Sequence, residues 1–356
     1  MSTPNPEDAS LAQLWHKARG IKSEDNPYSL SVAQAQAILH SLGIEGHVTV
    51  TMVKEYNHVY RIQCDDTFFM KTFTKDWYTI PNSGTYCVEH ERSAWHILAS
   101  HGISTPDILL AAQDENNPFG KPFILTRKVE GEPFDTLVKH ATEQEIHLLL
   151  RTLGAYLRRM HAITFYYPGY LMGDDGPTEA PDEQAWQHGI WTATRCQKDA
   201  LAWVQAMRQS LSDTMVQRLE QRLATMAQEL APDYIPPRFV HGDCHLEQFF
   251  LQREHGQWQV NGVVDMEVAS AGASAVDILS VCRELAQNLP VHTRWWESLF
   301  AGYGSTPSFA RFQLRLLGFW YPYEENVWPG SGDKGFNHIL TATHWDELFS
   351  DKSVKK

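Results

Sequence analysis

The chain has 356 residues, 43% of them hydrophobic and 21% charged, an ordinary balance for a globular protein large enough for two lobes. Its 43 acidic and 30 basic residues give a net charge of −13, which argues against nucleic acid as a partner. The five cysteines form no Cys-x-x-Cys pair, so neither a zinc site nor a disulfide framework is expected. The N-terminus does not resemble a signal peptide, and no apolar run approaches the length of a membrane span. We therefore expect a cytoplasmic protein without membrane contact.

Two short helices and a three-stranded meander are predicted for the first quarter of the chain. The helices are expected at residues 9–20 and 31–43. The strand-like runs, rich in β-branched and aromatic residues, cover residues 48–53, 58–62 and 67–73. The turn between the first two strands, residues 54–57, contains no glycine. The sequence therefore lacks the glycine-rich loop of protein kinases.

Lys71 and Glu91 are predicted to form an ion pair. Lys71 lies among aromatic residues of the third strand, where it needs an anion unless it is a surface lysine on the strand's polar face. A helix is predicted from about 86 to 100, and Glu91 falls near the centre of its apolar stripe. An unpaired buried carboxylate is costly, so Glu91 either pairs with Lys71 or extends to solvent.

The middle of the chain changes from strands to helices. Strands are predicted at 106–110 and 122–129, and helices at 143–162 and, as a pair, at 190–229. His161, at the end of the first of these helices, is interpreted as structural rather than catalytic. Residues 165–190 form a loop rich in Gly, Pro and Asp, and long loops of this kind are often functional.

The segment from His241 to Gln248 is the most informative part of the sequence. Counting from His241, an Asp falls at +2 (Asp243) and an amide side chain at +7 (Gln248), the spacing of the protein-kinase catalytic loop. Two apolar runs separated by a glycine-containing turn then predict a β-hairpin that ends at Asp265, where this carboxylate can face Asp243. One carboxylate could accept the proton of an attacking hydroxyl, while the amide oxygen and the second carboxylate hold a metal ion.

The last third of the chain is rich in aromatic residues. A helix is predicted to begin within residues 272–279, which include Asp277. Most of the aromatic side chains are expected in the core. The segment 320–328 also carries Glu324 and Glu325, and this mixture could bind a cation or stack on a sugar ring.

The His-Gly-Asp-x-His motif at 241–245 and the strand ending in Asp265 resemble the aminoglycoside phosphotransferase/choline kinase-like family of small-molecule kinases. The resemblance extends from about residue 30 through nearly the whole chain. It implies an α+β, two-lobe protein-kinase-like fold, with a β-rich N-lobe at 1–129, a helical C-lobe at 130–356 and an active site between them.

The resemblance also assigns roles to the residues of the motif. Asp243 matches the family's catalytic base, Asp265 its metal-binding Asp, and Asp277 the Asp that anchors the catalytic loop. Gln248 stands where the family usually has Asn, and its longer side chain could still ligate Mg²⁺. His245 is expected either to assist near the transferred phosphate or to hold the loop.

The nucleotide side of the site follows from the same resemblance. The Lys71–Glu91 pair would orient the phosphates of ATP. The family's lobe hinge would lie at Thr126, Lys128 and Val129, whose main-chain groups would hold the adenine.

We therefore expect an ATP- and Mg²⁺-dependent phosphotransferase that acts on a hydroxyl of a small polar metabolite or an aminoglycoside-like acceptor. The acidic residues of 165–190 and 320–328 favour a cationic acceptor, and a neutral sugar is the alternative. Two other functions stay open. One is a nucleotide-binding pseudokinase, suggested by Gln248 and the missing glycine-rich loop, and the other is nucleotidyl transfer on the same fold.

Overall fold

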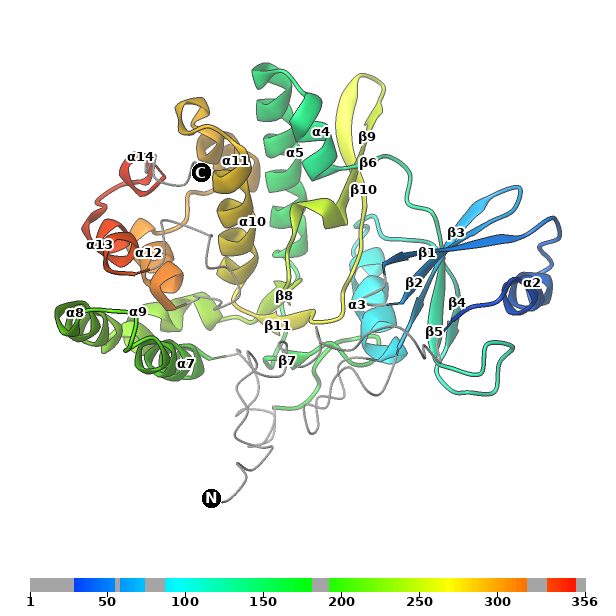
Figure 1. Ribbon diagram of the computed structural model, residues 1–356, viewed down its shortest axis with the longest axis horizontal. Helices are drawn as coiled ribbons and strands as arrows, with labels where there is room; N and C mark the ends of the chain where they lie inside the picture. Colours follow the sequence, from blue (N-terminus) through cyan, green and yellow to red (C-terminus); the bar gives the residue numbers. More distant parts are fainter. Residues whose placement is uncertain (1–28, 55–57, 74–86, 181–191, 319–331, 350–356) are drawn as a thin grey trace.

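In the computed structural model, the chain forms an antiparallel sheet lobe and a larger, mostly helical lobe, joined by the segment after β5 (Figure 1). The structure describes residues 29–54, 58–73, 87–180, 192–318 and 332–349. The α+β, two-lobe organisation predicted from the sequence is confirmed. The predicted helix at 9–20 and the segment 320–328 lie outside the described residues.

The N-lobe is built on a five-stranded sheet with the order β1-β2-β3-β5-β4, in which every neighbouring pair is antiparallel. Its strands are β1 (Thr49–Lys54), β2 (Val59–Gln63), β3 (Thr67–Thr72), β4 (Ile108–Ala112) and β5 (Phe123–Arg127). Its helices are α2 (Val32–Ser41) and α3 (Val88–Ser100). Ser31 caps α2 and forms a capping box with Gln34, which explains why the helix begins there.

The two faces of this sheet join different cores because side chains alternate along each strand. Ile62, Phe68 and Met70 point to one face and pack with residues of α2 in a core of the N-lobe. Phe73 and Ile124 belong instead to the core of the larger lobe, together with the buried face of α3. Lys71 lies between Met70 and Thr72 and so projects toward the second face. The sheet therefore directs Lys71 toward α3 and the C-lobe.

The C-lobe consists mainly of helices, together with two small three-stranded sheets. Its helices are α4 (Phe134–His140), α5 (Glu143–Met160), α7 (Ala193–Ala206), α8 (Asp213–Leu223), α9 (Met226–Leu230), α10 (Ala275–Asn288), α11 (Trp295–Tyr303), α12 (Phe309–Gly318), α13 (Asp333–Thr341) and α14 (Trp345–Leu348). The 3-10 turns among the described residues of this lobe are η3 (Ala231–Tyr234), η4 (Leu246–Gln248) and η5 (Val291–Thr293). Its strands are β6 (Glu132–Pro133), β7 (Gly169–Tyr170), β8 (Arg238–Val240), β9 (Phe249–Glu254), β10 (Gln257–Val263) and β11 (Ser270–Gly272).

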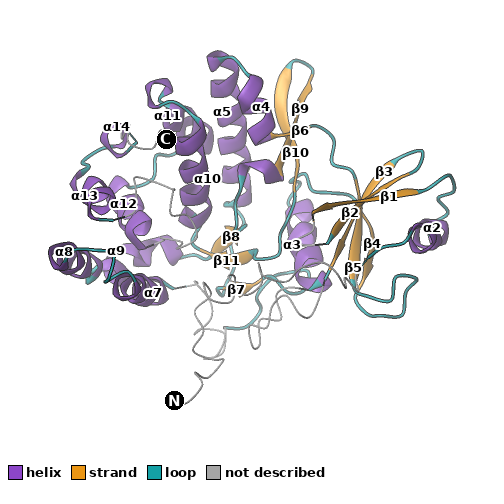
Figure 2. Ribbon diagram, in the orientation of Figure 1, coloured by secondary structure: helices purple, strands orange, loops and turns teal. Residues whose placement is uncertain are grey.

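The C-lobe strands form two small sheets that support the site, with orders β10-β9-β6 and β7-β11-β8 (Figure 2). The predicted hairpin is β9–β10, and the short β6 extends it immediately after the lobe connection. The loop between β8 and β9 carries the motif that begins at His241. Both sheets thus meet where the catalytic motif was predicted.

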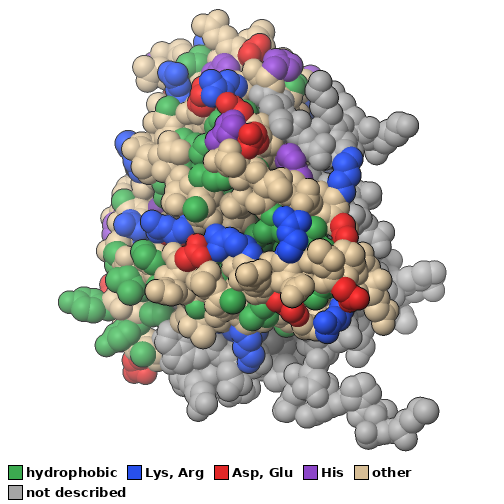
Figure 3. Space-filling view, turned by 90° about the vertical axis from the view of Figure 1, so that its left-hand side faces the viewer, with side chains coloured by type: hydrophobic (Ala, Val, Ile, Leu, Met, Phe, Trp, Pro, Cys, Tyr) green, Lys and Arg blue, Asp and Glu red, His purple; other side chains and the backbone are tan. Residues whose placement is uncertain are grey.

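The face opposite the N-lobe mixes basic, acidic and hydrophobic side chains, without separating them by charge (Figure 3). Among the described residues, no helix combines the length and the apolar character needed to cross a membrane.

Candidate active site

The loop that carries the catalytic motif is fixed by one buried carboxylate. Asp277 lies in the first turn of α10 and is fully buried. Its oxygens accept the main-chain N–H groups of His241 and Gly242 at 2.8 and 2.9 Å. The ring of His161 lies 3.1 Å from the same carboxylate. Asp277 therefore anchors the loop as predicted, and His161 supports this anchor, in line with the structural role predicted for it.

The loop backbone at Gly242 needs glycine. Its φ is +87°, and a Cβ atom there would lie 2.6 Å from the carbonyl oxygen of Val268. His241 adds a second connection, because its Nε2 lies 3.0 Å from the carbonyl oxygen of Val264. The loop is thus held against the segment that carries Asp265.

Asp243, His245 and Glu284 form a line of hydrogen-bonded side chains. Nε2 of His245 lies 3.0 Å from Oδ1 of Asp243, and its Nδ1 contacts Oε1 of Glu284 on α10. Glu284 also accepts the main-chain N–H of Leu246 at 2.6 Å. The side chain of Asp243 is 51% exposed, so a small molecule can reach it from solvent.

These contacts set the charges in the loop. The hydrogen bonds to Asp243 and Glu284 raise the pKa of His245 to about 10, so the ring is an imidazolium at neutral pH. Burial raises the pKa of Asp243, but the hydrogen bond and charge of His245 outweigh this effect and leave the pKa below its ordinary value. Asp243 is therefore a carboxylate, as a base must be.

The β9–β10 hairpin delivers Asp265 next to this loop. Asp265 follows the end of β10 and adopts a left-handed backbone conformation with φ of +69°, which is uncommon for a residue other than glycine and is often found at functional sites. The main-chain N–H of Val264 donates to the carbonyl oxygen of Gln248 at 3.1 Å. Gln248 is buried, and its Oε1 accepts the main-chain N–H of His245 at 2.8 Å. The segments that carry Asp265 and Gln248 are thus joined by a main-chain hydrogen bond.

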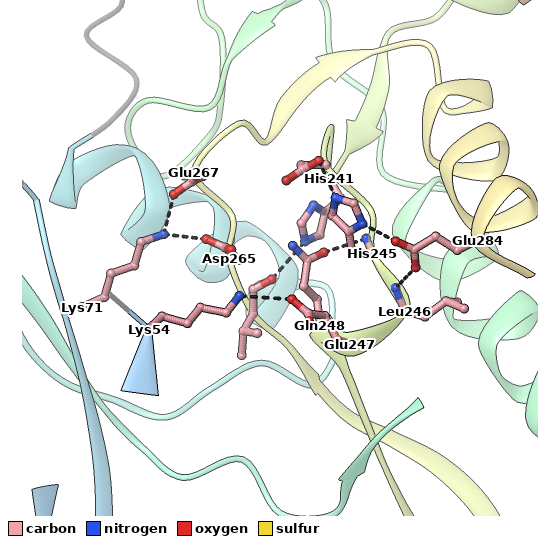
Figure 4. A network of polar contacts seen from close by, with 12 residues as sticks. Lys54, Lys71, His241, His245, Leu246, Glu247, Gln248, Asp265, Glu267 and Glu284 are labelled. Atoms are coloured by element: carbon pink, nitrogen blue, oxygen red, sulfur yellow. Dashed lines mark hydrogen bonds and ion pairs between the residues drawn. The ribbon is translucent and has the colours of Figure 1, made fainter. Parts of the chain in front are cut away.

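Lys71 is surrounded by three carboxylates (Figure 4 shows two of them). Its Nζ lies 2.7 Å from Asp265, 2.9 Å from Glu267 and 2.9 Å from Glu91. Glu91 is almost fully buried, and its other oxygen accepts the main-chain N–H of Met266 at 3.2 Å. The predicted Lys71–Glu91 pair is therefore present, and the two additional carboxylates come from the C-lobe.

The carboxylates around Lys71 differ in their protonation. Burial raises the pKa of Glu91, and it raises that of Glu267 to about 8, against the opposing charge of Lys71. Burial also acts on Asp265, but the charge and hydrogen bond of Lys71 prevail and hold its pKa well below the ordinary value. Asp265 is therefore the carboxylate of this group that stays ionised most firmly.

The three predicted hinge residues lie at the end of β5 and just beyond it. Thr126 is buried within the strand. The main-chain N–H of Lys128 donates to the carbonyl oxygen of Thr67 at 2.9 Å, so the sheet already uses this donor. Val129 borders Gly262 of β10, where a Cβ atom would lie 3.0 Å from it. Their role toward adenine stays a prediction.

The donor atoms near Asp265 have the chemistry that Mg²⁺ requires. Carboxylate oxygens come from Asp265 and Glu267, and the amide oxygen of Gln248 has a second lone pair beside its bond to His245. Among the described residues, no group of three or more His, Cys, Asp or Glu side chains is arranged as a metal site. The magnesium site of Gln248 and Asp265, which would combine a carboxylate with an amide, stays a prediction.

Sequence reasoning missed three residues of this site. Glu267 had a signal, because it stands two positions after Asp265. Glu284 had none, since only the packing of α10 brings it to the loop. Lys54, at the end of β1, pairs with Glu247 of the loop at 3.2 Å and also had no signal of its own.

A family model described as the phosphotransferase enzyme family matches residues 58–317, which are most of the chain and include every site residue named above except Lys54. The chain belongs to this family. None of the curated proteins matches it in sequence.

Solved structures with the same fold are distant in sequence. A Ralstonia eutropha protein assigned as an aminoglycoside phosphotransferase has 15% identity and a TM-score of 0.53, covering 82% of this chain and 86% of its own. APH(2″)-IIIa in complex with GDP and kanamycin has 17% identity and a TM-score of 0.50, covering 80% and 88%. Ethanolamine kinase from Plasmodium vivax has 9% identity and a TM-score of 0.50, covering 89% and 84%. At such identities the likeness establishes the fold of this phosphotransferase-family chain.

Proposed function

We propose that this chain is an ATP-dependent kinase that transfers the γ-phosphate to a hydroxyl group of a small polar molecule. The observation that carries the proposal is the half-exposed carboxylate of Asp243, which His245 holds in place. The loop of Asp243 is in turn hydrogen-bonded, through His241, to the segment that carries Asp265. Small-molecule phosphotransfer is the activity that the family membership supports.

In the proposed reaction, Asp243 accepts the proton of the acceptor hydroxyl as its oxygen attacks the γ-phosphorus. The bond between this phosphorus and the β–γ bridging oxygen breaks, and ADP leaves. His245 donates to one oxygen of Asp243 and so leaves the other oxygen for the acceptor. We assign His245 the loop-holding role, because both of its ring nitrogens face carboxylates.

Lys71 is proposed to bind the nucleotide phosphates, and Glu91 to hold Lys71 in position. Asp265 and Gln248 would hold Mg²⁺, with Glu267 as a further carboxylate beside them. When bound, Mg²⁺ would neutralise charge on the phosphates. Main-chain groups near Thr126, Lys128 and Val129 would hold the adenine.

The acceptor is proposed to carry a hydroxyl and, by preference, a positive charge. The C-lobe residues Asp174, Asp175 and Glu179 are exposed and acidic, while Asp182, Glu183, Glu324 and Glu325 lie outside the described residues. The kanamycin bound by APH(2″)-IIIa and the name of ethanolamine kinase point to amine-bearing molecules for those proteins. We place the reaction in the cytoplasm, where five free cysteines stay reduced.

A screen of hydroxyl-bearing metabolites and aminoglycosides with ATP and Mg²⁺, read by mass spectrometry, tests the proposal. A product heavier by one phosphoryl group is expected. A product heavier by one nucleotidyl group would establish nucleotidyl transfer instead. ATP binding without any product, across acceptors that related kinases use, would favour a pseudokinase.

A further inference from the structure

Lys54 is a second lysine of the N-lobe that reaches the catalytic loop. It is the last residue of β1, and its Nζ lies 3.2 Å from Oε1 of Glu247. Glu247 belongs to η4, between Asp243 and Gln248. The pair therefore connects the N-lobe sheet to the loop that carries the proposed base.

The strand register puts Lys54 on the same face of the sheet as Lys71. Lys54 is paired with Val59, and Val59 is in turn paired with Lys71. Residues directly opposite each other in antiparallel strands project to the same face. Since neighbouring strands lie about 4.8 Å apart, the two lysines begin about 10 Å from each other. Figure 4 shows both side chains extended toward the carboxylates of the C-lobe.

A β-bulge gives Lys54 this direction. The register shifts between Met52 and Lys54, so Val53 is an extra residue in β1. In a regular strand, Val53 would stand opposite Val59, and Lys54 would turn to the other face, which packs with α2. Bulges commonly re-aim a side chain next to an active site.

The ion pair between Lys54 and Glu247 lies at the surface of the protein. The side chains of Lys54 and Glu247 are 48% and 58% exposed, so water screens the attraction between their charges and the pair is weak. Lys54 thus faces the C-lobe beside Lys71, and it can exchange Glu247 for another anionic partner.

We propose that Lys54 is a phosphate-binding residue of the nucleotide site. When the nucleotide binds, Lys54 gives up its ion pair with Glu247 and binds oxygens of the β- or γ-phosphate instead. The inference rests on the proposed function, because it takes a nucleoside triphosphate as the donor. A phosphate group offers more negative charge than a single carboxylate, which favours the exchange. Glycine-rich loops bring main-chain N–H groups to phosphates, whereas residues 54–57 contain no glycine and supply a lysine side chain.

Calorimetric titration with Mg²⁺ and either ATP or adenosine tests this role. Lys54→Met should raise the Kd for ATP about tenfold, because a charged hydrogen bond to phosphate is lost, and leave the Kd for adenosine unchanged. Lys139→Met is the matched control. Lys139 is also an exposed lysine, and it pairs with Asp135 on its own helix at 2.7 Å, so its loss should change neither Kd.

Glu247→Gln completes the test by removing the competing partner. It should lower the Kd for ATP by about threefold, and this gain should vanish in combination with Lys54→Met. Equal ATP affinity of wild type and Lys54→Met would overturn the role of Lys54 and leave the proposed kinase activity standing. Failure of the wild-type protein to bind ATP would overturn both, and it is recognised without any variant.

Discussion

Asp243 combines an exposed side chain with a fixed orientation. Nε2 of His245 holds one of its oxygens at 3.0 Å. Asp243→Asn keeps the size of the side chain but removes the base, so turnover should fall by about two to four powers of ten. The Kd for ATP should change little. Steady-state rates with ATP and an identified acceptor, together with calorimetry, measure both quantities. Near-normal turnover would remove Asp243 from the chemical step.

Glu284 positions the loop through two separate contacts. One oxygen contacts Nδ1 of His245, and the other accepts the main-chain N–H of Leu246 at 2.6 Å. Glu284→Gln keeps an acceptor for Leu246 but loses the charge that faces His245. We expect kcat to fall about tenfold while KM for ATP stays the same, as for other residues that orient a catalytic group. A fall in melting temperature with unchanged kcat would show that Glu284 is only structural.

Lys71 and Glu91 should behave as one unit. Their ion pair is 2.9 Å long and nearly excluded from water. Lys71→Met and Glu91→Gln should each lower kcat/KM for ATP, and the double variant should be little worse than Lys71→Met. Lys71→Met should have the larger effect on kcat/KM, because Lys71 also contacts Asp265 and Glu267. Strictly additive losses of free energy in the double-variant cycle would argue against a shared function.

Among the elements, α10 determines where the catalytic loop lies. Asp277→Ala would leave the buried N–H groups of His241 and Gly242 without an acceptor, which costs about 1–3 kcal/mol for each group. We expect the free energy of unfolding to fall by about 3–5 kcal/mol in a urea titration. Asp277→Asn keeps one oxygen and should lose about half as much. An Asp277→Ala protein as stable as wild type would mean that the loop is held by other contacts.

Local sequence patterns predicted the elements that carry the site. The stripe around Glu91 predicted α3 and its pairing with Lys71, and the apolar runs predicted the β9–β10 hairpin. Local patterns could not predict that Glu284 and Lys54 contribute to the site. Glu284 depends on how α10 packs against the loop, and Lys54 depends on a bulge at Val53 that changes the strand register by one residue.

At the scale of the whole molecule, the change from strands to helices together with the family resemblance predicted two lobes. The sequence could not predict how the lobes face each other, because this depends on contacts between distant segments. From the N-lobe, Lys71 reaches Asp265 and Glu267 of the C-lobe, and Lys54 reaches Glu247. Each of these contacts joins an N-lobe cation to a C-lobe carboxylate. The lysines would attract the phosphates of the proposed donor, and the carboxylates would attract its Mg²⁺ ion.

The net charge of −13 should act on the acceptor over a longer range. A field of this sign attracts a cation, and salt screens the attraction over about 10 Å at 0.1 M. Arg92 offsets the negative charge of Asp174, from which it lies 3.3 Å away. Asp175 and Glu179 are exposed, and among the described residues no lysine or arginine lies within ion-pair distance of them.

We therefore expect kcat/KM for amine-bearing acceptors to fall by about three- to tenfold between low and high ionic strength. Neutral sugars of similar size serve as the control and should show little change, because only a charged acceptor is drawn by the field. Measuring both classes with one preparation at fixed ATP and Mg²⁺ separates this effect from salt effects on nucleotide binding. Turnover of neutral or anionic acceptors alone, with no dependence on salt, would refute the cationic preference while leaving phosphate transfer by Asp243 untouched, since the base needs a hydroxyl and not a charge.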